Sequence, residues 1–204
     1  MNKPVKIANH NHKITMLSDN GESFGTGISL PLSHKPKVID EAERIVLFCL
    51  NAGNWVKRYY WDSDTASVKH YWIKPINNEK SIDDSKLRNG ISILDSHNVF
   101  TGISGTFGVA GEHFTHNGML FCYSRFHKDE KITPVWEQVK EGTIRFNSMG
   151  SWPMETVGVE DSDGVWWYEY RVHQPDEQSL CHNPADHDSF SMSEAMISKY
   201  NLGV

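Results

Sequence analysis

Residues 44–50 read Arg-Ile-Val-Leu-Phe-Cys-Leu, a short apolar run rich in β-branched and bulky side chains. Runs of this length and composition, bounded by Gly, Pro, Asn or Asp, predict β-strands. The chain repeats this pattern from Arg44 almost to its end. The segments that it predicts as strands are 44–50, 55–61, 67–73, 90–94, 101–110, 119–126, 143–149, 154–160, 164–173 and 176–181.

Few segments outside these runs predict helices. Residues 133–142 begin with Thr-Pro and end with Gly, which are typical of a helix start and a helix end, and Val135, Trp136 and Val139 would face a core. Shorter helices are predicted at 37–44 and 193–200. Because strands and helices do not alternate, we expect a mainly β fold with a few short helices (α+β), in the form of a barrel or sandwich.

The length of 204 residues supports a single domain. Residues 1–43 are polar and show little periodicity, so we expect a partly mobile N-terminal arm there. The domain itself would occupy 44–190, and 191–204 would form a C-terminal helix or tail. Asp161-Ser162-Asp163 lies between two predicted strands and predicts a hairpin turn.

The composition disfavours several classes of function. Twenty basic and 26 acidic residues give a net charge of −6, which leaves no basic surface for nucleic acid. No apolar stretch approaches the roughly 20 residues of a membrane span, and the N-terminus lacks an apolar signal region. We therefore expect a soluble protein of a cytoplasm. Cys49, Cys122 and Cys181 are widely spaced, which favours reduced, buried thiols over disulfides.

The sequence predicts neither a metal nor a cofactor. The closest histidine spacings lie in 10–12, in 113–116 and in 182–187, and none has the paired cysteines or the His-Glu-x-x-His pattern of a zinc site. Gly102, Gly105 and Gly108 are interleaved with a strand pattern and do not open a helix, so they do not form a phosphate-binding loop.

Three separated segments carry residues that could act together. Residues 87–98 form a short strand that ends at His97. The predicted helix 133–142 leads through Gly142 into a strand that carries Ser148. Residues 176–186 form a strand with Glu177 near its start, followed by a proline turn. Each segment alone is compatible with a purely structural role.

Together, five motifs in order resemble a known family, the tailed-phage prohead (capsid maturation) proteases, which are related in fold to the herpesvirus assembly proteases. The resemblance covers about residues 44–190. The motifs are Gly-x-x-x-Leu-Asp-Ser-His-Asn at 90–98, Arg-Phe at 125–126, Val-Trp-x-x-Val-x-x-Gly at 135–142, Ser-x-Gly at 148–150 and Glu-x-Ser-Leu-x-x-x-Pro-Ala-Asp at 177–186.

The resemblance implies a herpesvirus-protease-like β-barrel flanked by helices, and a serine endopeptidase. His97 and Ser148 would be catalytic, and Glu177 would be the third member of the triad. The substrates implied are the phage scaffold protein, the removable segment of the major capsid protein and the protease itself. The implied site of action is the immature capsid in the host bacterial cytoplasm. Whether the chain also forms a homo-oligomer stays open. Neither nucleic acid nor a membrane is expected as a partner.

The chemistry of these residue types agrees with the resemblance. A serine hydroxyl becomes a good nucleophile when an imidazole takes its proton, and the imidazole needs a partner that fixes its tautomer. Gly150, which has no side chain, would let a substrate backbone approach the nucleophile.

Three alternatives stay open at this level. Glu169 competes with Glu177 for the third position of the triad. A non-enzymatic capsid-assembly protein that binds scaffold on the same barrel is the main alternative function. A small-ligand β-barrel built around the aromatic strand 165–170 is the other, although alternate positions of such a strand normally face a core.

Overall fold

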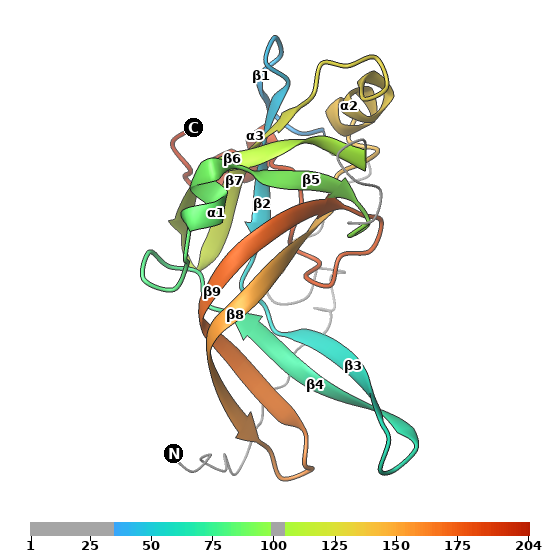
Figure 1. Ribbon diagram of the computed structural model, residues 1–204. Coiled ribbons are helices and arrows are strands. Elements are labelled where there is room, and N and C mark those ends of the chain that lie inside the picture. Colours follow the sequence, from blue (N-terminus) through green and yellow to red (C-terminus); the bar gives the residue numbers. More distant parts are fainter. Residues whose placement is uncertain (1–34, 99–104) are drawn as a thin grey trace.

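A single mixed β-sheet dominates the computed structural model, which describes residues 35–98 and 105–204 (Figure 1). The mainly β class with short helices is confirmed. The strands are β1 (Val38–Asp40), β2 (Ile45–Asn51), β3 (Val56–Asp62), β4 (Ser67–Pro75), β5 (Ile91–Asp95), β6 (Thr106–His116), β7 (Met119–Phe126), β8 (Asn147–Glu160) and β9 (Trp166–Leu180), and the helices are α1 (Ser85–Asn89), α2 (Thr133–Lys140) and α3 (Glu194–Lys199).

The long strand β9 determines the shape of the sheet. The strand order is β1-β2-β7-β6-β5-β9-β4-β3, and β8 pairs with β9. Along one edge of β9, its first residues pair in parallel with β4 and its last residues pair in parallel with β5. The other edge pairs with β8 over its whole length. As a result, β3, β4 and the far halves of β8 and β9 project from the rest of the molecule (Figure 1). We call this projection the arm, and the remainder the body.

The predicted closed barrel is wrong, because the sheet is open. Beyond the body, β9 continues outward and pairs with β4, and β8 follows along the other edge of β9 instead of pairing with β2. Among the described residues, the gap is crossed locally by the segment that follows β9 and by the Asn147 side chain, which donates to the Cys49 carbonyl (2.9 Å). The Cys49 amide donates to the Phe190 carbonyl (2.9 Å), and the Asn147 amide donates to the Ser189 carbonyl (3.0 Å).

Apolar residues of the body pack on both faces of the sheet, and β2 shows how. Val46, Phe48 and Leu50 face a cluster that includes Trp136 of α2, whereas Leu47 and Cys49 face a second cluster. The second cluster also holds Phe190, Met192, Met196, Ile197 and Leu202, so the predicted tail 191–204 packs on the sheet. Because both faces are covered, β2 is apolar at almost every position instead of alternating.

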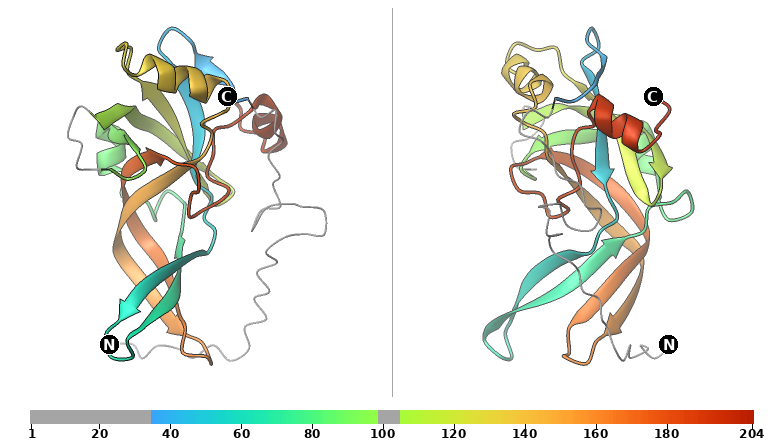
Figure 2. Two further views of the ribbon diagram at one scale, coloured as in Figure 1. Left: turned by 90° about the vertical axis from the view of Figure 1, so that its right-hand side faces the viewer. Right: turned by 180° about the vertical axis from the view of Figure 1, so that it is seen from behind.

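The predicted helices 133–142 and 193–200 are present as α2 and α3, and Figure 2 shows both at the end of the molecule away from the arm. The helix predicted at 37–44 is wrong. Residues 38–40 form β1, which pairs with β2, and a turn follows. No helix among the described residues is long and apolar enough to cross a membrane. Two predicted segments lie partly outside the described residues. These are residues 1–34 of the predicted mobile N-terminus and residues 101–104 of a predicted strand.

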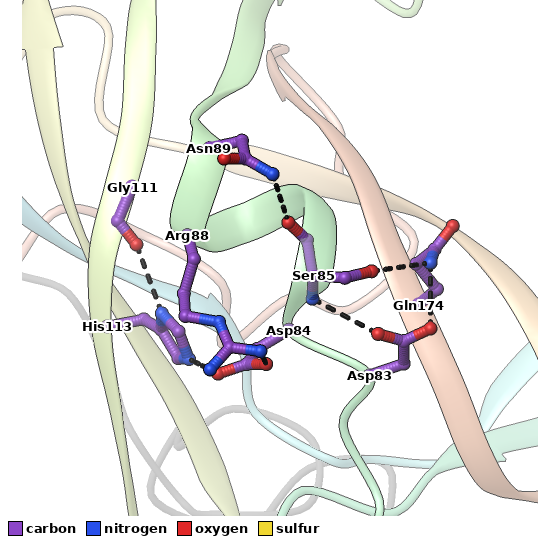
Figure 3. A network of polar contacts seen from close by, with 8 residues as sticks. All are labelled: Asp83, Asp84, Ser85, Arg88, Asn89, Gly111, His113 and Gln174. Atoms are coloured by element: carbon purple, nitrogen blue, oxygen red, sulfur yellow. Dashed lines mark hydrogen bonds and ion pairs between the residues drawn. The ribbon is translucent and has the colours of Figure 1, made fainter.

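The short helix α1, which the sequence analysis missed, is held between β6 and β9 (Figure 3). Gln174 of β9 donates to the Asp83 carboxylate (2.8 Å) and to the Ser85 hydroxyl (3.1 Å). His113 of β6 lies 3.5 Å from the Asp84 carboxylate on the other side. These contacts fix the start of β5, the strand that leads to His97.

Candidate active site

His97 lies in a tight turn directly after β5. Ser96 and His97 have φ values of 49° and 62°, in the left-handed region that non-glycine residues seldom occupy. Strand β9 holds the turn in place. The Ser96 amide donates to the Leu180 carbonyl (3.0 Å), and the His97 amide donates to the Ser179 hydroxyl oxygen (2.9 Å). Unusual backbone of this kind persists only where the surrounding structure fixes it, and it is concentrated at functional sites.

The carboxylate of Glu177 connects His97 to β9. One oxygen, Oε1, contacts Nδ1 of His97, and the other, Oε2, accepts a hydrogen bond from the Ser179 hydroxyl (2.5 Å). Glu177 is buried, whereas the His97 side chain is about half exposed. With Nδ1 used by the carboxylate, the second ring nitrogen, Nε2, is left for a group in the neighbouring pocket.

Ser148 lies on β8, where it pairs with Ser179 of β9. It is 7% exposed, and together with His97 it lines a pocket of about 390 Å³. The structure thus brings the three predicted residues to one place, although it shows no hydrogen bond between these two described residues, His97 and Ser148.

Gly150 also lines the pocket, and the structure gives a further reason for a glycine there. Gly150 pairs with Glu177, and a Cβ built at position 150 would lie 2.9 Å from Cγ and Cδ of Glu177. Such a distance is an overlap, so the absence of a side chain makes room for the carboxylate. The predicted approach of a substrate backbone stays a prediction.

Glu169, the competing carboxylate, lies elsewhere. It pairs with Lys74 of β4 and Val157 of β8, in the arm. It precedes Glu177 by 177 − 169 = 8 residues of the same strand, about 26 Å at the usual rise. Of these two carboxylates, only Glu177 contacts His97.

The rest of the pocket wall comes from parts of the chain that the sequence analysis did not connect. Asp186 follows β9, and its carboxylate accepts hydrogen bonds from the Ala52 amide (2.8 Å) and the Asn54 side chain (2.9 Å). Burial raises the pKa of Asp186. The remaining lining residues are Asn51, Val56, Arg58, Tyr71, Ile73, Pro75, Met149, Ser151, Tyr170 and Ala185. Ser179, which contacts both Glu177 and His97, could have been predicted from the sequence, because it is the serine of the Glu-x-Ser-Leu motif.

The aromatic strand 165–170 lies in the arm instead of a core. Trp166 and Tyr168 stack with their ring centroids 5.6 Å apart, and Trp167 stacks on Trp72 at 5.1 Å. All of 165–170 are partly exposed, so the expected core strand is wrong. Tyr170 reaches the pocket, and no closed barrel interior surrounds the strand.

The histidine spacings have ordinary surroundings where they are described. His113 contacts Asp84, and its Nδ1 donates to the Gly111 carbonyl (3.0 Å). His182 is exposed, and residues 10–12 lie outside the described residues. Within 35–98 and 105–204, no three His, Cys, Asp or Glu side chains are grouped to hold a metal ion.

No protein-family model, curated protein or solved structure matches this chain. The chemistry of the site is therefore inferred from its own residues. A buried carboxylate on one imidazole nitrogen, with a serine hydroxyl on the same pocket wall, is an arrangement suited to nucleophilic acyl transfer.

Proposed function

We propose that the chain is a serine hydrolase in which Ser148 is the nucleophile, His97 the general base and Glu177 the residue that orients His97. The observation that carries the proposal is the contact between Nδ1 of His97 and the Glu177 carboxylate, on the wall of a pocket that Ser148 also lines. Such a contact leaves Nε2 to take the serine proton and stabilises the imidazolium that results.

The reaction follows from these roles. The Ser148 oxygen attacks a carbonyl carbon while its proton moves to Nε2 of His97. His97 then gives this proton to the leaving amine, as the bond between carbonyl carbon and nitrogen breaks. Water then attacks the acyl carbon while His97 takes its proton, the bond to the Ser148 oxygen breaks, and His97 returns the proton to Ser148. Backbone amides near Ser148 would stabilise the oxyanion.

Within this class, we propose an endopeptidase of tailed-phage capsid maturation. The five ordered motifs support it, since three of them supply His97, Ser148 and Glu177. The substrates would be the phage scaffold protein, the removable segment of the major capsid protein and the enzyme itself. It would act in the immature capsid, in the host bacterial cytoplasm. A herpesvirus-protease-like fold of the body, with the sheet left open, belongs to the same proposal.

An active-site-directed reagent tests the proposed class. A fluorophosphonate probe is expected to label the wild-type protein on Ser148 and to leave Ser148→Ala unlabelled. Ser162→Ala, which changes an exposed serine in the turn between β8 and β9, serves as the matched control and should be labelled like the wild type. Absence of labelling in the folded wild type would favour the non-enzymatic capsid-assembly protein.

Co-expression with the capsid proteins tests the particular function. Mass spectrometry of the major capsid protein and scaffold is expected to show discrete cleavage with the wild type. Ser148→Ala and His97→Ala should each lower the cleavage rate by several orders of magnitude, and the double variant should fall no further. Additive losses in the double variant would contradict a common catalytic unit.

A further inference from the structure

One wall of the pocket is supplied by the arm, and it carries an arginine. Arg58 of β3 pairs with Tyr71 of β4, and both residues line the pocket together with Tyr170 of β9. Ser148 lines the same pocket from the start of β8. The pair of β8 and β9 runs from the body into the arm (Figure 1), and the pocket lies between arm residues and Ser148.

The guanidinium of Arg58 has no hydrogen-bonded or ion-paired partner within the described part of the chain, although its charge acts on the Tyr170 hydroxyl. It makes no hydrogen bond, ion pair or ring contact there, although it is partly buried. Other arginines are engaged: Arg44 donates to the His127 carbonyl (2.9 Å), and Arg88 lies 2.9 Å from the Asp84 carboxylate. A guanidinium presents a planar set of donors that matches a carboxylate, and the match is strongest in a partly enclosed site.

The acidic group of the pocket is already used. Both oxygens of Asp186 accept hydrogen bonds from the chain's own donors, and the residue is 6% exposed. A basic side chain entering the pocket would thus find its counter-charge buried and occupied, and it would meet Arg58 as a like charge. An acidic side chain would meet the positive charge of Arg58, which lines the pocket together with Tyr71 and Tyr170.

We propose that Arg58 binds an acidic side chain of the substrate and thereby selects the bond that is cleaved. This inference rests on the proposed protease function. Because Arg58 and Ser148 both lie on strands of one sheet, the acidic residue should occupy one fixed position relative to the cleaved bond. Tyr71 and Tyr170 would pack on the aliphatic part of that side chain.

The test is a cleavage map made with the full chain. The probe is a peptide library in which Glu, Gln or Lys occupies each position in turn, with the products read by mass spectrometry. The wild type is expected to favour Glu over Gln by about tenfold or more at one position. Arg58→Gln should abolish this preference, and Arg58→Glu should shift it toward Lys.

Lys57→Gln is the matched control. Lys57 is the neighbouring cation of β3, on the opposite face, where its ammonium lies over the rings of Tyr59 and Trp72. This variant should keep the Glu preference. Fluorophosphonate labelling of Ser148 is measured for every variant as a check on the nucleophile, and Lys57→Gln, which changes a residue that does not line the pocket, should be labelled like the wild type.

The outcomes separate the two proposals. Labelling and cleavage without an acidic preference, or with a preference that survives Arg58→Gln, would overturn the role of Arg58 and leave the protease function intact. A preference for Lys in the wild type that is lost in Asp186→Asn would likewise overturn it. A folded wild type that is neither labelled nor able to cleave any peptide would overturn both.

Discussion

Glu177 is the residue on which the contacts of the candidate site converge. Its carboxylate contacts His97, accepts from Ser179 and occupies the space that Gly150 leaves open. Each of these neighbours comes from a different position on β8, β9 or the turn after β5. A change at any of them should therefore affect the orientation of the imidazole before it affects the fold.

The first prediction compares the two carboxylates of β9. Glu177→Gln keeps the size of the side chain and removes its charge, so turnover should fall by roughly 10 to 10⁴-fold without unfolding. Glu169→Gln should change turnover by less than about threefold, since Glu169 lies in the arm. Single-turnover cleavage beside thermal melts measures both. Wild-type turnover in Glu177→Gln with a crippled but folded Glu169→Gln would assign the carboxylate to the aromatic strand.

The second prediction concerns Ser179, a positioning residue. Its hydroxyl accepts from the His97 amide and donates to Glu177, so Ser179→Ala removes one hydrogen bond from the turn and one from the carboxylate. We expect kcat to fall by about 10- to 100-fold with little change in KM.

Ser124→Ala is the matched control for Ser179→Ala. Ser124 is a buried serine of β7 whose hydroxyl donates to Gln178 (2.6 Å), which points to the opposite face of β9 from Glu177 and Ser179. Both variants should lose about 1 kcal/mol of stability or somewhat more. Equal kcat values for the two variants would show that the hydrogen bonds of Ser179 contribute to stability alone and do not position His97.

At the scale of elements, β9 shows what the sequence could and could not predict. Its two halves were expected as separate strands, 164–173 and 176–181, and the structure joins them into one strand that runs through Pro175. The structure accommodates Pro175 because β4 pairs only as far as Tyr170 and β5 begins only at Glu177. On the β8 side, a bulge lies next to Pro175. A missing amide in this gap costs no strand-to-strand hydrogen bond.

Sequence patterns predict local features, but they do not predict which distant strands pair with one another. The sequence predicted His97, Ser148 and Glu177 as site residues because each of them lies within a short motif of neighbouring residues. Arg58 belongs to no motif, and only the pairing of β3, β4 and β9 brings it to the pocket. The short helix α1 lacks a long apolar period, and it is fixed by contacts with β6 and β9.

The third prediction uses His173, in the middle of β9. His173 is fully buried, and burial lowers the pKa of its imidazole to about 4. The ordinary value is about 6.5, so between pH 6.5 and pH 4 the unfolded chain binds more protons than the folded one. Stability should fall as the pH drops through this window, by about 3 kcal/mol in total.

Urea unfolding at a series of pH values measures the effect of His173. His173→Gln is expected to lose most of this dependence, whereas His182→Gln, which changes an exposed histidine after β9, should keep it. An unchanged slope in His173→Gln would show that other groups cause the acid sensitivity.

On the scale of the whole molecule, the body and the arm differ in how they are held together. Both faces of the body carry apolar clusters, whereas the arm exposes large side chains such as Tyr59 (66%) and Trp61 (64%). An open sheet of this shape was not predictable from strand patterns, because the pairing of β9 with β4 and β5 joins residues distant in the chain.

The fourth prediction tests the body as a unit. Cys49 of β2 and Cys122 of β7 are buried in it, and burial raises the pKa of Cys122 to about 12. Only Cys181, which is partly exposed, should react with iodoacetamide under native conditions. Mass spectrometry of alkylated peptides should show Cys49 and Cys122 reacting only as the protein unfolds in urea. Rapid native alkylation of Cys49 would contradict the covered faces of β2.

The overlap between position 150 and Glu177 also bears on the history of the sequence. The two positions are 177 − 150 = 27 residues apart, yet a side chain at the first excludes the carboxylate at the second. A side chain at position 150 would force the Glu177 side chain to shift, and with it the carboxylate that contacts His97. Among descendants of a common ancestor, the two positions should therefore covary, with glycine at 150 retained in every lineage that keeps glutamate at 177.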